Sequence, residues 1–218
     1  MRSYFSFPNA SLKVSAMMIL YSTPASPFGR KVKIAAQHLG LADRIEVRGA
    51  DVNNDDDPLL KANPVGKIPA LTLEDGTTLF DSRVILDYLD HLAGGNRILP
   101  ASPESRYRAL VLQAACDGLI DAAILQIYER RYRPEDKRHQ PWVDRQADKV
   151  SRTLATLETH PTEVDGAIHV GAITKACALG YLDFRFEGAW RATHPNLVAW
   201  LTRFEEAVPA FSATTPSD

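Results

Sequence analysis

Two serines near the start of the chain have the chemistry to act on a bound ligand. Ser22 directly follows a short apolar run, and Ser26 opens the sequence Ser-Pro-Phe-Gly-Arg-Lys-Val. A serine followed by proline is typical of a helix start, with serine as the N-cap and proline as the first helical residue. Because a helix N-terminus carries partial positive charge, a hydroxyl there can help to hold an anion. Ser26 is therefore either a cap alone or a cap that also contacts a bound ligand, and Ser22 is the second candidate.

A further group of candidate residues lies in the sequence Asn-Pro-Val-Gly-Lys-Ile-Pro-Ala-Leu, residues 63–71. Pro69 precedes a strand-like run, where a trans proline would end strand pairing. A cis bond is the alternative, because the cis form is far less unfavourable before proline than elsewhere. It would turn the backbone N–H and C=O of Ile68 toward solvent, where they can pair with an extended peptide, as an added strand does. Lys67 is either a turn residue or a ligand contact.

The pair Asp81-Ser82 comes directly before the apolar residues of a predicted helix. Free N–H groups at a helix start favour a carboxylate, and the two side chains can add to such a site. Asp81 can also be an N-cap with no further role. Together with the proline turn, this helix start predicts a site that holds a small peptide by its backbone and by its charged end.

The composition is that of an ordinary globular protein. The chain has 218 residues, of which 45% are hydrophobic and 24% charged, enough for one large domain or two small ones. Its 25 basic and 27 acidic side chains give a net charge of -2, which provides no general attraction to nucleic acid or to an anionic membrane. We expect no apolar run of membrane-spanning length. Neither nucleic acid nor a membrane is expected as a partner.

Metal and disulfide chemistry are not indicated by the sequence. Cys116 and Cys177 lie apart in alanine-rich, helix-like segments, which predicts buried thiols kept reduced in a cytoplasmic protein. The six histidines show no ligand spacing, so no metal site is predicted. Residues 1–16 are polar and lack the apolar stretch of a secretory signal, and we expect them to form a disordered leader.

Strand and helix patterns alternate around the candidate residues. Strands are predicted at residues 18–21, 45–48, 70–73 and 77–80, and helices at residues 28–39, 58–62 and 84–92. Asp75-Gly76 is a strong hairpin-turn signal between the last two strands. This order predicts a small mixed sheet with helices on its faces, rather than a doubly wound nucleotide-binding fold.

Strand patterns almost disappear after the first hundred residues. Apolar residues at helical spacing predict helices at residues 107–122, 141–157, 173–184 and 197–208. The predicted organisation is a leader at 1–16, an α/β domain at 17–95, a linker at 96–102, an all-α domain at 103–212 and a tail at 213–218.

An α/β thioredoxin-like domain with this proline turn, followed by an all-α domain, resembles the cytosolic glutathione transferase superfamily. The resemblance rests on residues 26–32, 63–71, 81–85 and 176–185, and it covers the chain from Met18 to about Phe211. The motif at 63–71 is quite specific, whereas the others would be weak alone. The resemblance implies the glutathione transferase fold, glutathione as co-substrate, a homodimer and a cytoplasmic enzyme.

The resemblance also implies roles for individual residues. Ile68 would pair through its backbone with the cysteinyl amide of glutathione, next to the cis proline Pro69. Asp81 would face the ammonium of the γ-glutamyl group, while Ser82 and the helix amides would face its carboxylate. Ser26 corresponds to the thiol-activating residue, and serine there favours thiolate stabilisation over thiol–disulfide exchange.

The implied reaction is attack of the glutathione thiolate on an apolar electrophile held against the helical domain. The helical residues that could face this electrophile are Tyr107, Arg108, Tyr128 and Arg131. Two alternatives stay open. One is a glutathione-dependent isomerase or dehalogenase on the same fold, and the other is a non-catalytic transferase-like module for binding or stress regulation.

One segment departs from the family pattern. Members of the family usually begin the apolar central helix with a Ser/Thr-x-x-Asp capping box, whereas this chain has His169-Val170-Gly171-Ala172. Loss of an N-cap costs about 1 kcal/mol, so a weaker start to this helix is expected.

Overall fold

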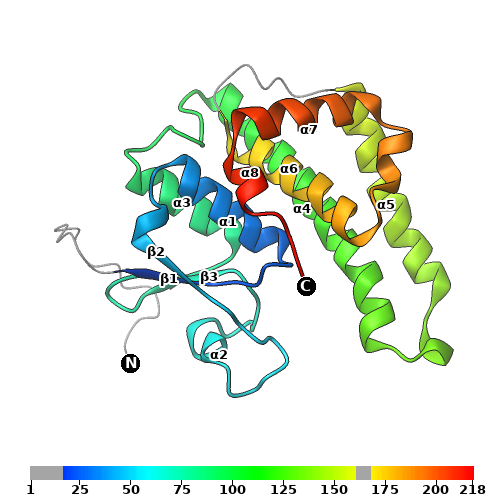
Figure 1. The fold of residues 1–218 in the computed structure, drawn as a ribbon, viewed down its shortest axis with the longest axis horizontal. Coiled ribbons are helices and arrows are strands. Elements are labelled where there is room, and N and C mark those ends of the chain that lie inside the picture. Colours follow the sequence, from blue (N-terminus) through cyan, green and yellow to red (C-terminus); the bar gives the residue numbers. More distant parts are fainter. Residues whose placement is uncertain (1–16, 161–167) are drawn as a thin grey trace.

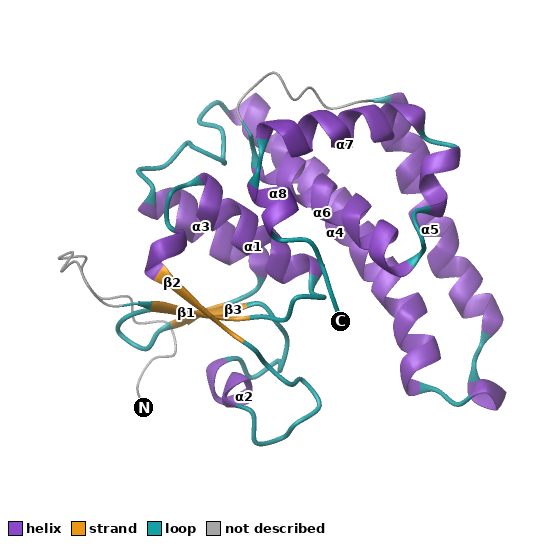
Figure 2. Cartoon of the chain, in the orientation of Figure 1, coloured by secondary structure: helices purple, strands orange, loops and turns teal. Residues whose placement is uncertain are grey.

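The computed structural model describes residues 17–160 and 168–218. A small sheet lies at one end of the molecule, and a larger set of helices forms the rest (Figure 1). Among the described residues, the strands are confined to the N-terminal part, and every regular element after residue 100 is helical (Figure 2). The glutathione transferase fold, an α/β thioredoxin-like domain followed by an all-α domain, is therefore confirmed. The predicted leader at 1–16 lies outside the described residues.

The N-terminal domain is a four-stranded mixed sheet with helices on both sides. Its elements are β1 (Met18–Tyr21), α1 (Pro27–His38), β2 (Ile45–Arg48), α2 (Pro58–Ala62), β3 (Ala70–Thr72), β4 (Thr78–Leu79) and α3 (Ser82–Leu92). The strand order is β2-β1-β3-β4, with β1 parallel to β2 and β3 antiparallel to both β1 and β4. Helices α1 and α3 cover one face, and α2 lies on the other side (Figure 1). The β3–β4 hairpin confirms the Asp-Gly turn signal.

The C-terminal domain is built around one long helix. Its elements are α4 (Pro103–Tyr132), α5 (Gln140–Thr159), α6 (Val170–Arg185), α7 (Pro195–Ala207) and α8 (Ala210–Ala213). Short 3-10 turns cover Ala42–Arg44, Glu135–Lys137 and Ala189–Ala192. Helix α4 packs against α5 and α6, and α6 packs against α1 of the N-terminal domain. Sequence periodicity missed α8, because a four-residue helix after Pro209 is too short to show a repeat.

Helix starts follow the capping residues written in the sequence. Ser26, Asp57, Asp81 and Ser102 each accept a hydrogen bond from a backbone N–H in the first turn of the helix that follows. Proline occupies the first turn of α1, α2 and α4, where its missing N–H leaves no helical bond unmade. The local sequence therefore fixes where the helices next to the candidate site begin.

The start of α6 differs from the expectation. His169 is the N-cap, and its Nδ1 accepts a hydrogen bond from the N–H of Ala172 at 3.2 Å. Burial lowers the pKa of His169, which favours the neutral ring that can accept. The structure therefore has a side-chain cap where the sequence pattern indicated that the cap was lost, because a neutral imidazole takes the place of the hydroxyl; the weaker helix start stays a prediction.

Helix α4 is more apolar than the sequence analysis expected of any segment. An 18-residue stretch within Pro103–Tyr132 has a mean hydropathy of 1.6, so by length and composition the helix could cross a membrane. The prediction that no apolar run reaches this length is wrong. Because α4 packs between α5 and α6, its apolar residues serve as the centre of the helical domain.

Helix α1 joins the two domains. The Arg30 guanidinium donates to the carbonyl oxygen of Phe211 at 2.7 Å and lies 4.0 Å from the centre of the Phe211 ring. The next residue in the chain, Lys31, donates a hydrogen bond to Asp117 on α4. Both cationic side chains are buried, so α1 fixes the helical domain against the sheet by polar contacts as well as by packing.

Candidate active site

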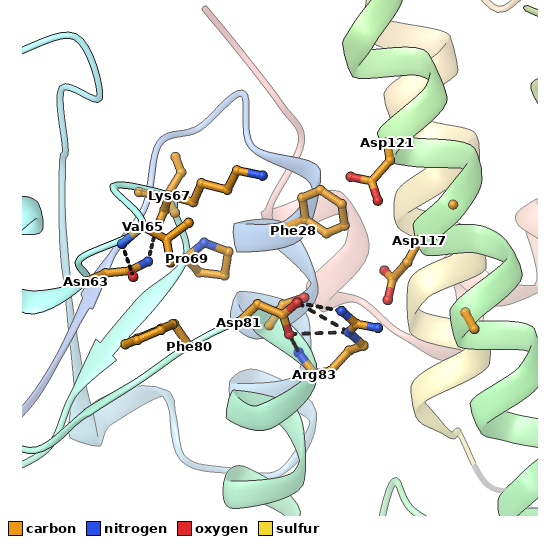
Figure 3. Close-up of a pocket in the computed structure, with 14 residues that line it drawn as sticks. Phe28, Asn63, Val65, Lys67, Pro69, Phe80, Asp81, Arg83, Asp117 and Asp121 are labelled. Atoms are coloured by element: carbon orange, nitrogen blue, oxygen red, sulfur yellow. Dashed lines mark hydrogen bonds and ion pairs between the residues drawn. The ribbon is translucent and has the colours of Figure 1, made fainter. Parts of the chain in front are cut away.

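A cleft of about 540 Å³ lies between the N-terminal domain and α4. Figure 3 shows its residues on two facing walls. The N-terminal wall consists of Phe28, Asn63, Val65, Lys67, Ile68, Pro69, Phe80, Asp81, Ser82 and Arg83. The α4 wall consists of Ala114, Asp117, Gly118 and Asp121. The cleft therefore contains all five residues that the sequence predicted as ligand-binding.

The proline turn forms one end of the cleft. The Ile68–Pro69 peptide bond is cis. Among the described residues, the N–H and C=O of Ile68 make no hydrogen bond to another backbone group. Asn63 braces the turn, because its Nδ2 donates to the carbonyl of Lys67 at 2.7 Å and its Oδ1 accepts from the N–H of Val65 at 3.0 Å. A braced turn with unused backbone groups can accept an extended peptide.

Asp81 lies at the start of α3 and is held by Arg83. Its Oδ1 accepts from the Arg83 N–H at 3.0 Å, and its Oδ2 accepts from the Arg83 guanidinium at 2.9 Å. Partial burial acts to raise the pKa of Asp81, but the hydrogen bonds from Arg83 hold it below its ordinary value. The carboxylate is therefore charged, and a ligand ammonium would have to compete with Arg83 for it.

Ser82 belongs to a buried polar network that connects the two walls. The Lys31 ammonium donates to Ser82 Oγ at 3.1 Å and to Asp117 Oδ1 at 2.6 Å. Because Ser82 Oγ accepts from Lys31, its own proton remains available to a ligand carboxylate in the cleft. Burial raises the pKa of Asp117, although the neighbouring Lys31 acts to lower it.

The two serines predicted as catalytic, Ser22 and Ser26, are not among the residues that line the cleft. Ser26 is the N-cap of α1, and its Oγ accepts from the Gly29 N–H at 3.0 Å. Ser22 Oγ donates to the Thr23 carbonyl at 3.3 Å. A Cβ on Gly29 would collide with Ser22 Oγ, so the absence of a side chain at Gly29 leaves room for the Ser22 hydroxyl in its present position. Of the two hydroxyl protons, that of Ser26 is the one not used in these bonds.

The α4 wall was not found by sequence reasoning. None of the expected Tyr107, Arg108, Tyr128 and Arg131 lines the cleft. Asp117 and Asp121 do, four residues apart and therefore on one face of the helix. Burial raises the pKa of Asp121, while Lys67 acts to lower it. The sequence did contain a signal for this wall of the cleft: two carboxylates four residues apart in a mainly apolar stretch of the helix.

Comparison with known proteins shows the family to which this chain belongs. The model for the N-terminal domain of glutathione S-transferases matches residues 20–97, and the model for the C-terminal domain matches residues 140–203. The uncharacterized GST-like protein YibF of Escherichia coli (strain K12) is 32% identical over 187 residues, which covers 83% of this chain and 90% of that protein. The chain belongs to the glutathione S-transferase superfamily.

Two solved glutathione S-transferase structures resemble this chain over most of its length. A family member from Pseudomonas fluorescens Pf-5 with bound glutathione is 41% identical, with a TM-score of 0.86, and covers 92% of this chain and 100% of that one. The protein from Methylobacillus flagellatus KT with bound glutathione is 30% identical, with a TM-score of 0.85 and the same coverage. A second structure of the Pseudomonas protein holds S-(propanoic acid)-glutathione, at a TM-score of 0.82.

Proposed function

We propose that this protein is a glutathione transferase that binds glutathione in the cleft and activates its thiol as a thiolate for attack on an apolar electrophile. The observation that carries the proposal is the Ile68–Pro69 turn, whose Ile68 backbone groups make no backbone hydrogen bond, in the same cleft as Ser82 at the start of α3. Bound glutathione in two structurally similar relatives supports it.

The residues of the cleft suggest how glutathione lies. The Ile68 backbone pairs with the cysteinyl residue, and Pro69 sets the shape of the turn. The Ser82 hydroxyl and the first amides of α3 hold the γ-glutamyl carboxylate, and the Asp81 carboxylate, which also caps this helix, faces the γ-glutamyl ammonium. Lys67 is a cation at the edge of the cleft and attracts the carboxylates of the peptide.

Ser26 is the residue proposed to activate the thiol, with Ser22 as the alternative. A free thiol has a pKa of about 8.5, so it is mostly protonated near neutral pH. Lowering that pKa by about two units requires about 2.7 kcal/mol of stabilisation of the anion. A hydrogen bond to a charged group contributes about 1.5–3 kcal/mol, so one bond from the Ser26 hydroxyl together with the start of α1 is sufficient.

The electrophile is proposed to bind beside the thiolate on the α4 side. Phe28, Ala114 and Gly118 provide apolar surface there. S-(propanoic acid)-glutathione bound to the Pseudomonas relative is a glutathione thioether, the kind of product that such an attack forms. We further propose a cytoplasmic homodimer that uses no metal, by analogy with the family.

The direct test combines binding and turnover. The purified protein is expected to be retained on immobilised glutathione, to elute with free glutathione, and to conjugate chlorodinitrobenzene. Retention without turnover on this or other electrophiles would favour a binding module. Unchanged glutathione with an isomerised or dehalogenated substrate would favour the other enzymatic alternatives. A protein that does not bind glutathione would contradict the proposal.

A further inference from the structure

We propose that Asp121 donates a proton to the electrophile, so that the cleft is suited to electrophiles that gain a proton when the thiolate adds to them. The α,β-unsaturated carbonyl compounds are a class of this kind. The inference rests on the proposed function and deepens it, because it gives a catalytic role to a residue of α4 that sequence reasoning did not find.

The first observation is the position of Asp121 in the cleft. It lies on the α4 wall, and its side chain is exposed, so a molecule in the cleft can reach it. Its carboxylate projects from α4 toward Phe28 on the opposite wall (Figure 3). Phe28 lies in the first turn of α1, two residues after the proposed activating residue Ser26. An electrophile that rests on Phe28 beside the sulfur would therefore have the Asp121 carboxyl group on its other side.

The second observation is that Asp121 differs from the other carboxyl groups that line the cleft. Asp81 pairs with Arg83 at 2.9 Å, and Asp117 pairs with Lys31 at 2.6 Å. Asp121 makes no hydrogen bond or ion pair with the other cleft residues that Figure 3 draws. Because an ion pair holds a carboxyl group in its charged form, Asp121 is the one of these three that is best placed to carry a proton.

The charges around Asp121 favour the protonated form on balance. Burial raises the pKa of Asp121. Of the charged groups around it, Lys67 on the proline turn, Arg83 on α3 and Lys31 on α1 act to lower this pKa, and Asp81 acts to raise it. The net change raises the pKa of Asp121, whereas the pKa of Asp81 is lowered. Two carboxyl groups whose pKa values are separated in this way are typical of a site in which one acts as an acid and the other stays charged.

The proposed step adds the thiol across a carbon–carbon double bond. The thiolate sulfur bonds to the β-carbon, and the π electrons of the double bond move to form an enolate. The α-carbon then takes the proton of the Asp121 carboxyl group, which restores the carbonyl and leaves Asp121 as a carboxylate. Solvent returns a proton to Asp121, in balance with the proton that the thiol released. General acid catalysis of this kind contributes about 10²- to 10⁴-fold to a rate.

The test compares two electrophiles that differ in their need for a proton. Benzylideneacetone takes up a proton on addition, whereas chlorodinitrobenzene loses chloride and takes up none. Turnover with each is measured at saturating glutathione for the wild type, Asp121→Asn, Asp121→Glu and the control Asp148→Asn, which changes an exposed residue of α5 outside the cleft. The ratio of the two rates cancels effects on thiol activation, because both reactions share that step.

The ratio of benzylideneacetone to chlorodinitrobenzene turnover should depend on the acid at position 121. We expect Asp121→Asn to lower this ratio about 100-fold, the lower end of the range for general acid catalysis. Asp121→Glu keeps a carboxyl group and should restore much of the ratio, and Asp148→Asn should leave it as in the wild type. Thermal melting of each variant checks that the protein is folded.

The pH dependence of the ratio is a readout that a purely structural role would not change. Donation requires the protonated carboxyl group, so in the wild type the ratio should fall as the pH rises through the pKa of Asp121. Titration of the thiol cancels, because both reactions use the thiolate. In Asp121→Asn the ratio should not change with pH. The same pH dependence in the wild type and in this variant would contradict the inference.

The outcomes distinguish this inference from the proposed function. A wild type that conjugates neither electrophile overturns both. An Asp121→Asn variant that keeps the wild-type ratio overturns the inference and leaves the proposed function intact. Equal losses with the two electrophiles also overturn it, and they would assign Asp121 to thiol activation or to glutathione binding instead.

Discussion

At the scale of single residues, several side chains proposed to act at the site also stabilise the fold. Ser26 caps α1 and keeps a hydroxyl proton for a ligand. Ser82 accepts from Lys31 and faces the cleft, and Asp81 caps α3 while it bonds Arg83. A substitution at any of these positions therefore changes both stability and activity. Variants have to be chosen so that one of the two effects is kept constant.

Ser26 allows such a choice. Ser26→Ala removes the cap and the hydroxyl, so we expect a loss of about 1 kcal/mol in stability and about 10- to 100-fold in turnover. Ser26→Asp keeps a strong N-cap but brings a negative charge to the thiolate, so stability should be retained while turnover falls at least as far. Chemical denaturation and conjugation kinetics measure the two effects. If Ser22→Ala lowers turnover and both Ser26 variants do not, the activating role belongs to Ser22.

At the scale of elements, local signals fix starts and turns, but they do not fix which helix face meets the cleft. The cap at Ser26, the turn at Pro69 and the hairpin at Asp75-Gly76 depend on neighbouring residues and were predictable. The orientation of α4 depends on Lys31, which comes from an element more than eighty residues away. Periodicity along α4 could not reveal that contact, so Asp117 and Asp121 were missed.

The start of α6 gives an element-scale prediction about pH. Burial lowers the pKa of His169 in the folded protein, so the unfolded chain binds the additional proton more readily. This contribution to stability is complete above the unfolded value of about 6.5 and is lost as the pH falls through the lowered folded pKa. His169→Asn keeps a capping side chain without a titrating group.

Denaturation curves at pH 7.5 and pH 5.5 measure this effect. We expect the wild type to lose more stability than His169→Asn between the two values, and the difference is the contribution of this one side chain. His169→Ala should be less stable by about 1 kcal/mol at pH 7.5. Equal pH dependence in the wild type and in His169→Asn would show that the ring does not act as the cap.

At the scale of the whole molecule, α1 is the element on which both domains depend. Its Arg30 contacts α8, its Lys31 contacts α4, and its Phe28 lines the cleft. The close approach of α6 requires Gly180, because a Cβ there would collide with Arg30 Nη1 and come within 3.3 Å of Phe211. The domain interface and the thiol site therefore share one rigid helix.

Glycine substitutions test this interface. Gly180→Ala is expected to destabilise the protein, even though alanine is favoured over glycine in a helix by about 1 kcal/mol. Gly118→Ala on α4 is the matched control for stability, because nothing lies within 4 Å of its added Cβ, and it should be neutral or stabilising. Thermal melting of both variants measures the two changes in stability. A gain in stability for Gly180→Ala would show that α1 and α6 are not packed this closely.

The central claim is that the cleft lowers the pKa of the glutathione thiol. The direct measurement is a pH titration of the ultraviolet thiolate absorbance of glutathione bound to the protein. We predict a thiol pKa about two units below the free value of about 8.5, and a value closer to the free one in Ser26→Ala. Glutathione that binds but titrates as it does in water would contradict this account.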